Sequence, residues 1–537
     1  MGQAKALQGI VGKTRLGKYP AVQGSDWSLN MFPEDNDGNA YMASVPGLRF
    51  LSEIFKGRKC RGTYVSTRGL SSRDSDEDLF ACMGGAVFRV DADGSSASIG
   101  SVSQAVERVC FAETGGERPL LLVADGSALR YYDLVNGGTL HVLQLPERLD
   151  GSGLVTPSHV AVVAGSIVIN DTGSGYVYYS VPYPLSQETR TLFRMGDDGQ
   201  PVYKDDGLTV ETYEEDSALC VFEDSYGVVQ YFNGESSSDR VNAVYAVGSA
   251  LYLFGPKSVE TWQRGSSEYQ TWVRTSYTIN AANGLDAPYS LASVSERVFY
   301  VGSGESYGKA VMSVSGTAFE KVSPPWLDAK LRGESTESAR GFCYSVDGHV
   351  FYVLQLGALG ETWVYDASGG SWHERSSRDR VSGMRKAWRV GGVAWKGGKF
   401  YAFTDDGGMY DFSGGYFYED FSASERLPMV RVRQGPVIVD GFRPFVFEEL
   451  AVECNVGAWD DYSLSPKLLL EVSRDGGETF GNVRSATLGR TGDYSHRVRF
   501  HGLGYGRLAV ARLTYSHPTD FVISAAEARA ESTGALV

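Results

Sequence analysis

The amino-acid sequence predicts an all-β protein built around a β-propeller of six or seven blades, and three observations support this prediction. The 537-residue chain is rich in glycine, with 65 residues, and in aromatics, with 31 Tyr and 25 Phe. Aromatic side chains favour pleated strands, and glycine supplies the positive φ of tight turns. A strand–turn–strand unit recurs along the chain, and no segment sustains the pattern of a long amphipathic helix.

Residues 1–45 are predicted to form an N-terminal arm ahead of the propeller. The first 20 residues carry four basic residues and no acidic one, and they show little apolar periodicity. Such a segment is either mobile or docked on a partner. The candidates for docking on an acidic neighbour are Lys5, Lys13, Arg15 and Lys18.

The propeller is predicted to span residues 46–440. There, an apolar strand, a Gly or Asp-Gly turn and a second, aromatic-rich strand occur seven times. The copies begin at Leu79, Leu120, Ala161, Ala243, Leu291, Gly341 and Gly391. All intervals but one measure 41 to 50 residues, which is typical of propeller blades with about four strands. A run of unrelated hairpins in a large sandwich is the alternative.

The exceptional interval, 82 residues between the third and fourth copies, contains an acidic insertion. Residues 181–240 carry 13 acidic and 4 basic residues, and so supply −9 of the net charge of −15. Interleaved aromatic residues indicate partly ordered strands, although a solvated loop is the commoner outcome for such a run. The tightest cluster consists of Glu211, Glu214, Glu215, Asp216, Glu223 and Asp224.

Residues 441–537 are predicted to form a separate β-sandwich-like domain, because five segments alternate apolar and polar residues at period two. Within it, SRDGGETF resembles the Asp box of sialidase-type propellers, with Phe where Trp is usual. The Asp carboxylate of this motif can accept hydrogen bonds from turn amides, so we expect a structural turn. Its residues are Ser473, Asp475, Gly477, Thr479 and Phe480.

The net charge of −15 argues against a general nucleic-acid binder, because affinity for phosphate comes from clustered Lys and Arg. It is compatible with a protein that DNA slides past. Six cysteines lie far apart with no CxxC pair, which indicates free thiols in a reducing compartment.

Neither the first residues nor any later segment predicts a membrane protein. The basic start has no apolar core of signal-peptide length. The longest apolar stretch, Val160–Ile169, is too short to span a bilayer. We therefore expect a protein made in a cytoplasm, without membrane insertion.

No catalytic, cofactor or metal site is predicted, and we expect the protein not to be an enzyme. Gly12-Lys13-Thr14 lacks the earlier glycine of a phosphate-binding loop, and the glycines at 502, 504 and 506 precede no helix. The seven histidines stand in no HExxH or Gly-x-Ser-x-Gly context. Two carboxylates placed across space, as a glycosidase needs, cannot be recognised in a sequence.

Five stretches together resemble the packaged-DNA stabilisation proteins, also called tail hub or nozzle proteins, of short-tailed bacteriophages. The resemblance lies in pattern and order over nearly the whole chain. The stretches are Ser28–Phe50, Gly255–Gly265, Gly284–Gly302, Thr362–Trp372 and Leu468–Arg507. The acidic segment 181–240 departs from the family pattern.

The resemblance implies a β-propeller with added β domains that assembles as a ring, with six copies, beneath the adaptor attached to the portal. It implies a structural virion protein of the tail that closes the head, retains packaged DNA and conducts it at ejection. Implied partners are other copies of the chain, the adaptor and portal, tail spikes or fibres, a needle or plug protein, and passing genomic DNA without sequence-specific binding.

An acidic surface repels phosphate, so the cluster in 181–240 is a candidate DNA-repelling surface. The alternative function is a carbohydrate-binding or glycoside-hydrolysing propeller, which the Asp-box match and the aromatic content suggest. Oligomeric state separates the two functions, because a ring assembly favours the first and a monomer with glycan affinity favours the second.

Overall fold

The structure, a computed structural model, consists almost entirely of strands, with one α-helix, α1 (Pro325–Gly333), in the part of the chain that it describes. No helix in that part is long and apolar enough to cross a membrane. The described residues are 4–6, 15–16, 25–36, 39–66, 77–91, 94–116, 118–182, 189–219, 221–234, 240–267, 270–275, 284–294, 296–440, 443–456, 464–489 and 496–532.

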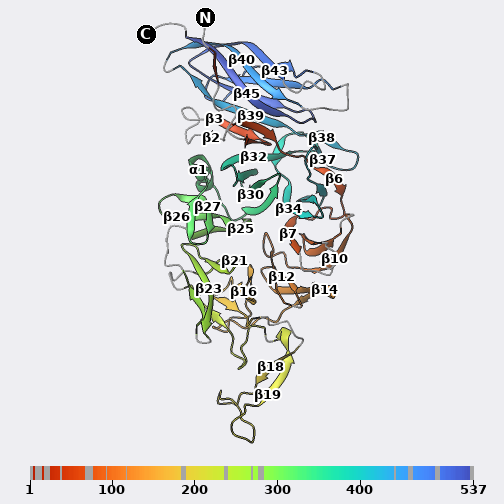
Figure 1. Cartoon of the computed structure of the whole chain (residues 1–537), viewed down its shortest axis with the longest axis vertical. Helices are drawn as coiled ribbons and strands as arrows, with labels where there is room; N and C mark the ends of the chain where they lie inside the picture. Colours follow the sequence, from red (N-terminus) through yellow and green to blue (C-terminus); the bar gives the residue numbers. More distant parts are fainter. Residues whose placement is uncertain are drawn as a thin grey trace.

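Seven antiparallel units of four strands surround a common centre as the blades of a propeller (Figure 1). The first blade contains β7 (Cys60–Ser66), β8 (Asp78–Met83), β9 (Ala86–Val90) and β10 (Ser96–Ser101). The second contains β11 (Cys110–Glu113), β12 (Leu120–Ala124), β13 (Leu129–Asp133) and β14 (Gly137–Val142). The third contains β15 (Val160–Val163), β16 (Ser166–Asn170), β17 (Val177–Tyr179) and β20 (Tyr231–Phe232).

The remaining four blades continue around the ring in chain order. The fourth contains β21 (Ala243–Val247), β22 (Ala250–Phe254), β23 (Val259–Ser267) and β24 (Gln270–Arg274). The fifth contains β25 (Gly284–Val294), β26 (Arg297–Gly304), β27 (Gly308–Ser315) and β28 (Ala318–Lys321). The sixth contains β29 (Arg340–Val346), β30 (His349–Leu356), β31 (Glu361–Asp366) and β32 (Ser371–Arg378). The seventh contains β34 (Val390–Lys396), β35 (Lys399–Thr404), β36 (Met409–Asp411) and β6 (Arg49–Ser52).

The ring closes because the outermost strand of the seventh blade comes from the beginning of the chain. In β6, Phe50 pairs with Tyr410 of β36, and its amide donates to Asp420 Oδ2 at 2.9 Å. Each of the seven sequence repeats lies in a different blade, so the fold prediction is confirmed with the blade count at seven. The glycines of the Asp-Gly turns in the second, sixth and seventh blades, Gly126, Gly348 and Gly407, adopt positive φ of +84°, +83° and +91°.

The acidic insertion leaves the third blade between its third and fourth strands, which explains the interval of 82 residues. It contains the hairpin β18 (Thr189–Phe193) and β19 (Thr212–Asp216) and a short 3-10 helix, η2 (Ser217–Leu219). This hairpin forms one end of the elongated molecule, and the C-terminal β domain forms the other (Figure 1).

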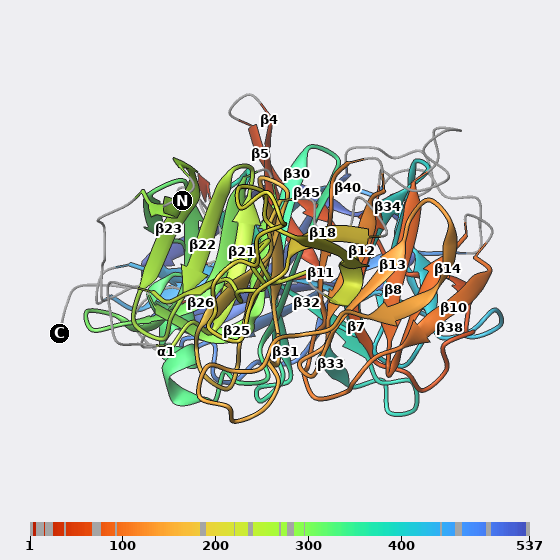
Figure 2. The same cartoon turned by 90° about the horizontal axis from the view of Figure 1, so that it is seen from below.

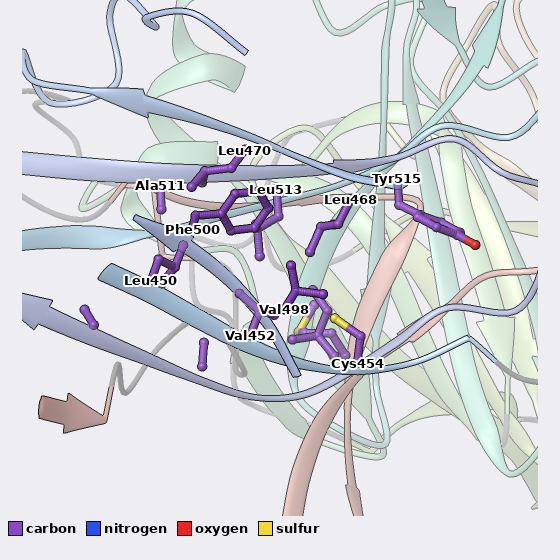
Figure 3. Close-up of a cluster of buried hydrophobic side chains, with 14 of the residues drawn as sticks. Leu450, Val452, Cys454, Leu468, Leu470, Val498, Phe500, Ala511, Leu513 and Tyr515 are labelled. Carbon is purple, nitrogen blue, oxygen red and sulfur yellow. The ribbon is translucent and has the colours of Figure 1, made fainter. Parts of the chain in front are cut away.

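The C-terminal domain is a sandwich of two sheets. The first sheet has the order β4 (Met31–Asn36), β5 (Asn39–Ser44), β45 (Val522–Ser532), β40 (Phe445–Asn455) and β43 (His496–Gly506). The second contains β3 (Ser25–Leu29), β39 (Arg431–Val439), β44 (Leu508–Tyr515), β41 (Lys467–Ser473) and β42 (Arg484–Thr487). Apolar side chains of both sheets, including Leu450, Val498 and Leu513, form the core between them (Figure 3).

The expectation of a separate N-terminal arm through residue 45 was wrong. The three strands within residues 25–44 belong to the sandwich, and β1 (Ala4–Ala6) pairs with β45. Of these strands, β1, β3 and β5 pair with strands that lie hundreds of residues later in the chain. The pairing covers sheet edges whose backbone groups would otherwise lack hydrogen-bond partners. Met31 and Met42 are fully buried in the sandwich core.

One sheet runs from the propeller into the sandwich. β3 pairs antiparallel with β39 and, at Leu29, parallel with Glu374 of β32. The sixth blade and the second sheet of the sandwich therefore form one sheet of eleven strands, including β2 (Arg15–Leu16) and β33 (Arg385–Ala387). Asn30, with φ +54°, continues this link, since its amide donates to Glu374 O and its Nδ2 to Val430 O.

Candidate functional surfaces

The six acidic residues singled out in the sequence all lie on the insertion of the third blade. Glu214 is on β19 opposite Thr191 of β18, whose hydroxyl donates to Glu214 Oε1 at 2.6 Å. Glu211 lies 3.4 Å from Arg194. The two strands of the hairpin therefore hold these carboxylates at the surface.

Two further carboxylates of the insertion accept hydrogen bonds from turn amides where the chain returns to the propeller. Asp216 accepts a hydrogen bond from the amide of Ala218, and Asp224 accepts one from the amide of Tyr226. Glu223 is half-buried, and this burial, with the neighbouring Glu215, raises its pKa. Two of these acidic residues thus accept hydrogen bonds that hold local turns, in addition to contributing negative charge to the surface.

The insertion is anchored at its base and exposed beyond it. Leu192 is buried, and Val221 and Phe222 pack into the apolar cluster between the second and third blades. Beyond this base, and on β20 where the chain re-enters the third blade, large apolar side chains are exposed among the acidic residues. The sequence did not predict this exposure. The exposed side chains are those of Tyr203, Leu208, Tyr213, Leu219, Tyr226, Val228 and Tyr231.

Of the four basic residues of the predicted arm, Lys13 and Lys18 lie outside the described residues. Lys5 is in β1, opposite Ala528, and Arg15 is in β2, opposite Asp26. The backbone at these two positions pairs with strands of the same chain. Docking of these cations on another protein stays a prediction.

The segment that resembles an Asp box forms a turn after β41 that its own side chains close. Ser473 Oγ accepts a hydrogen bond from the amide of Gly477 at 2.8 Å, and both carboxylate oxygens of Asp475 accept from Thr479. The Ser473 hydroxyl also donates to Asp475 Oδ1 at 2.6 Å, and this bond, together with those from Thr479, holds the pKa of Asp475 below its usual range. The guanidinium of Arg512 lies over the ring of Phe480, 3.4 Å from its centroid. This motif gives the carbohydrate-active alternative no support, since its polar groups are engaged within the turn.

The inner strands of the blades enclose a cavity of about 310 Å³ at the centre of the propeller. Arg108 lines it and donates to Gly391 O at 3.3 Å, and burial lowers the pKa of its guanidinium. His159 also lines it, with Nδ1 2.9 Å from Ser158 Oγ, and burial lowers the pKa of His159 to about 4. A histidine with this pKa is neutral at pH 7 and acts here as a hydrogen-bonded part of the wall.

Two other buried or half-buried ionisable side chains, those of His349 and Arg340, are engaged in pairs. His349 Nδ1 lies 2.9 Å from Asp366, and Arg340 pairs with Asp405 at 2.5 Å. Among the residues described above, no group of three or more His, Cys, Asp or Glu side chains is arranged to hold a metal ion.

Solved structures resemble this chain in fold, at low sequence identity. The chain is similar to solved propellers: a catalytically inactive virginiamycin B lyase from Staphylococcus aureus with quinupristin is 10% identical, with a TM-score of 0.38, over 68% of this chain and 98% of that chain. A gluconolactonase from Xanthomonas campestris is 12% identical, with a TM-score of 0.29, over 71% of this chain and 96% of that chain. These likenesses carry no argument about function. A comparison with curated protein sequences gave no match.

Two family models match the chain, and both describe the same phage protein. Residues 206–406 match the model of the bacteriophage P22 Gp10 β-propeller, and residues 431–531 match the model of the Gp10 β-sandwich. Together they cover more than half of the chain, in the order in which the structure places the two domains. The chain therefore belongs to the bacteriophage P22 Gp10 family. Members of this family are phage structural proteins of the tail and packaged-DNA stabilisation type.

Proposed function

We propose that this protein is a subunit of a ring-shaped hub or nozzle in the tail of a phage, below the portal and its adaptor. In this position it closes the head, retains the packaged DNA and conducts the DNA at ejection. Six copies form the ring, as the family resemblance implies. The protein acts as a structural part of the virion tail, assembled in the host cytoplasm, and not as an enzyme.

The observation that carries this proposal is the eleven-stranded sheet that joins propeller and sandwich in a member of the Gp10 family. A protein that holds packaged DNA in the head must not bend at the joint between its domains. Here the two domains are joined by ladder hydrogen bonds on β3 and by the side chain of Asn30, in addition to chain connections. Backbone pairing between the domains opposes the relative domain motion that is otherwise expected.

Charge also supports passage of DNA without trapping. Each phosphate neutralised by Lys or Arg releases counterions and deepens binding, so a strongly basic lining would hold DNA in a salt-sensitive manner. The chain has a net charge of −15. The adaptor and portal, spikes or fibres, and a needle or plug are the remaining proposed partners, placed around the ring by the family resemblance.

The proposal is tested with particles that are assembled in the absence of this protein. We expect such heads to package DNA and then lose it, which DNase sensitivity and electron microscopy of the heads would measure. Supplying the full chain during assembly should restore DNA-filled heads. Heads that keep their DNA equally well without the protein would contradict the proposed role.

A further inference from the structure

The acidic insertion ends in a turn that presents an aliphatic side chain to solvent. Asp206 Oδ1 accepts hydrogen bonds from the amides of Leu208 and Thr209, at 2.9 and 2.8 Å, and Oδ2 accepts one from the Thr209 hydroxyl at 2.5 Å. The turn is thus held in one conformation, and yet Leu208 is 87% exposed. Leu208 thus presents most of its side chain to solvent from an ordered turn.

The surroundings of this turn combine apolar side chains with negative charge. Residues 203–231 contain seven of the 18 large apolar side chains that are exposed in the described part of the chain. Residues 189–234 contain ten acidic and three basic residues. Apolar and tyrosine side chains within a charged rim are typical of a protein contact, and the negative charge makes a basic partner the complementary one.

A second loop of the same chain has the complementary chemistry. Between β32 and β33, Asp379 Oδ1 accepts hydrogen bonds from the amides of Val381 and Ser382, at 3.2 and 2.8 Å. Arg378 Nε donates to Gly383 O at 3.0 Å. This turn is also held in one conformation, and it displays Val381, 94% exposed, and Met384, 69% exposed.

The second loop is itself net positive, and four of its five basic side chains, those of Arg380, Arg385, Lys386 and Arg389, pair with carboxylates of the same chain. Residues 378–389 contain five basic residues and one acidic residue. Arg380 pairs with Glu425, and Lys386 pairs with Asp379, with both cations largely exposed. Exposed pairs of this kind exchange partners at little cost, so the cations remain available to another surface.

We propose that the insertion of one copy, residues 189–234, docks on the basic loop of a neighbouring copy, residues 378–389. The loop follows β32, which lies beside the sandwich, whereas β18 and β19 form the opposite end of the molecule (Figure 1). In the view from below (Figure 2), β33 and β18 are labelled apart from each other: β33 pairs with β32 of the sixth blade, whereas β18 pairs with β19 of the insertion. The two surfaces therefore meet between copies and not within one chain.

A contact between two different surfaces of identical chains is heterologous, and such contacts close a ring when the rotation between copies closes and build an open filament when it does not. The proposed function requires the closing rotation. This inference rests on the proposed ring function and names the surfaces that would build it. The exposed aliphatic side chains supply affinity, and the opposite charges supply orientation and salt sensitivity. Because both turns are fixed by hydrogen bonds in the free chain, docking loses little conformational entropy.

The test is a charge swap with two variants of the full chain. The insertion variant carries Asp205→Lys, Glu211→Lys, Glu214→Lys and Glu215→Lys, which change the net charge of residues 189–234 from −7 to +1. The loop variant carries Arg380→Glu, Arg385→Gln and Lys386→Glu, which change the net charge of residues 378–389 from +4 to −1. In each variant alone both surfaces have the same sign, so we expect the contact to weaken about 100-fold and DNA-filled particles to become rare. When the two variants are expressed together during assembly, opposite signs face each other at every contact, and particle yield should recover.

Matched control variants are Glu305→Lys and Lys399→Glu, which reverse charges at exposed positions of the fifth and seventh blades. They should assemble as the unchanged chain does. A thermal melt of each purified variant confirms that it folds. Normal assembly of either charge-reversed variant alone, or failure of the co-expressed pair to recover, would overturn the proposed contact.

A second variant tests the contact directly in assembled tails. A chain with Leu208→Cys and Val381→Cys should be joined to its neighbours by a short bismaleimide, giving a ladder of covalent oligomers, while either change alone gives none. If tails contain the protein as a ring but give no covalent oligomers, the proposed contact is wrong and the proposed function is unaffected. Tails that lack the protein would instead contradict the proposed function.

Discussion

The two ends of the molecule differ in which side chains they bury and which they expose. At the sandwich end, cations are buried: Arg431 and Arg433 of β39 are 0% and 1% exposed. At the insertion end, apolar side chains such as Leu208 are exposed and the charges lie around them. Burial of charge is tolerated only where hydrogen bonds satisfy it, and exposure of apolar surface is retained where a contact needs it. The comparison indicates that the sandwich end stabilises the chain and the insertion end serves its neighbours.

Arg431 shows what the sandwich end gains from a buried cation. Its guanidinium donates to Thr519 O at 2.7 Å and to His517 O, and it lies between the rings of Phe417 and Tyr515. It thereby joins the propeller, β39 and the chain before β45. Burial lowers the pKa of Arg431 to about 10, so it stays charged at pH 7.

The largest expected effect on stability follows from removing this cation. Arg431→Ala should lower the free energy of unfolding by about 4 kcal/mol, because it opens a cavity and leaves buried carbonyls without donors. Urea unfolding measures the change. The control Arg497→Ala, at an exposed arginine paired with Glu453, should change it by less than about 0.5 kcal/mol. Equal losses in the two variants would remove the contrast between buried and exposed cations.

The next effect concerns acid and arises at a buried histidine in the wall of the propeller cavity. His159 has a pKa of about 4 in the folded chain against an ordinary 6.5, because burial disfavours its charged form. The unfolded chain therefore takes up a proton first, so stability is complete above pH 6.5 and falls as pH drops toward 4. The loss attributable to His159 is up to about 3 kcal/mol.

Replacing this histidine tests the assignment. In His159→Gln the loss of stability between pH 6.5 and 4 should be smaller by about that amount, as denaturant titrations at several pH values would show. His373, whose pKa burial also lowers, contributes a loss of the same sign that the variant retains. An unchanged pH profile would mean that His159 is accessible to protons in the folded chain.

A smaller effect is expected at the link between the domains. Asn30 combines φ +54° with hydrogen bonds from its side chain to Val430 O and from the Ser376 amide to its Oδ1. Asn30→Ala should cost about 2 kcal/mol, since it loses these bonds and places Cβ in a strained conformation. Asn30→Gly removes only the bonds and should cost less. If the two variants unfold at the same urea concentration, strain plays no part in the link.

The smallest effect on stability is expected at the exposed end. Leu208→Ser should leave the free energy of unfolding within about 0.5 kcal/mol of the unchanged chain, because the side chain packs against nothing in it. The same variant should reduce assembly of tails. Chemical unfolding and particle counts on one preparation would measure both. A large loss of stability would show that Leu208 serves the fold and not a contact.

The repeating part of the fold could be predicted from the sequence because its information is local. Each strand, turn and strand of a blade lies within about 50 residues, and the Asp-Gly pairs mark the turns. Closure could not be predicted in the same way, because β6 pairs with a strand more than 350 residues later. The sequence of a short strand near the start of the chain does not show which distant strand it will pair with. The sequence therefore predicts an arm where the structure has β3 to β5 of the sandwich.

The candidate surfaces were predicted only in part for a related reason. Charge is visible in a sequence, so Glu214 and its neighbours could be selected, and the structure brings them onto one hairpin. Exposure is not visible, because Val221 and Val228 look alike in a sequence, yet the first is buried at the base of the insertion and the second is exposed. The apolar character of the insertion therefore required the structure.

The measurement that tests the central claim most directly is electron microscopy of tails assembled with this chain, at a resolution that places its propeller and sandwich. The account predicts a closed ring of six copies in which each propeller and sandwich move as one body and each insertion, residues 189–234, reaches the next copy. A stable dimer with two-fold contacts, or tails from which the protein is absent, would contradict it.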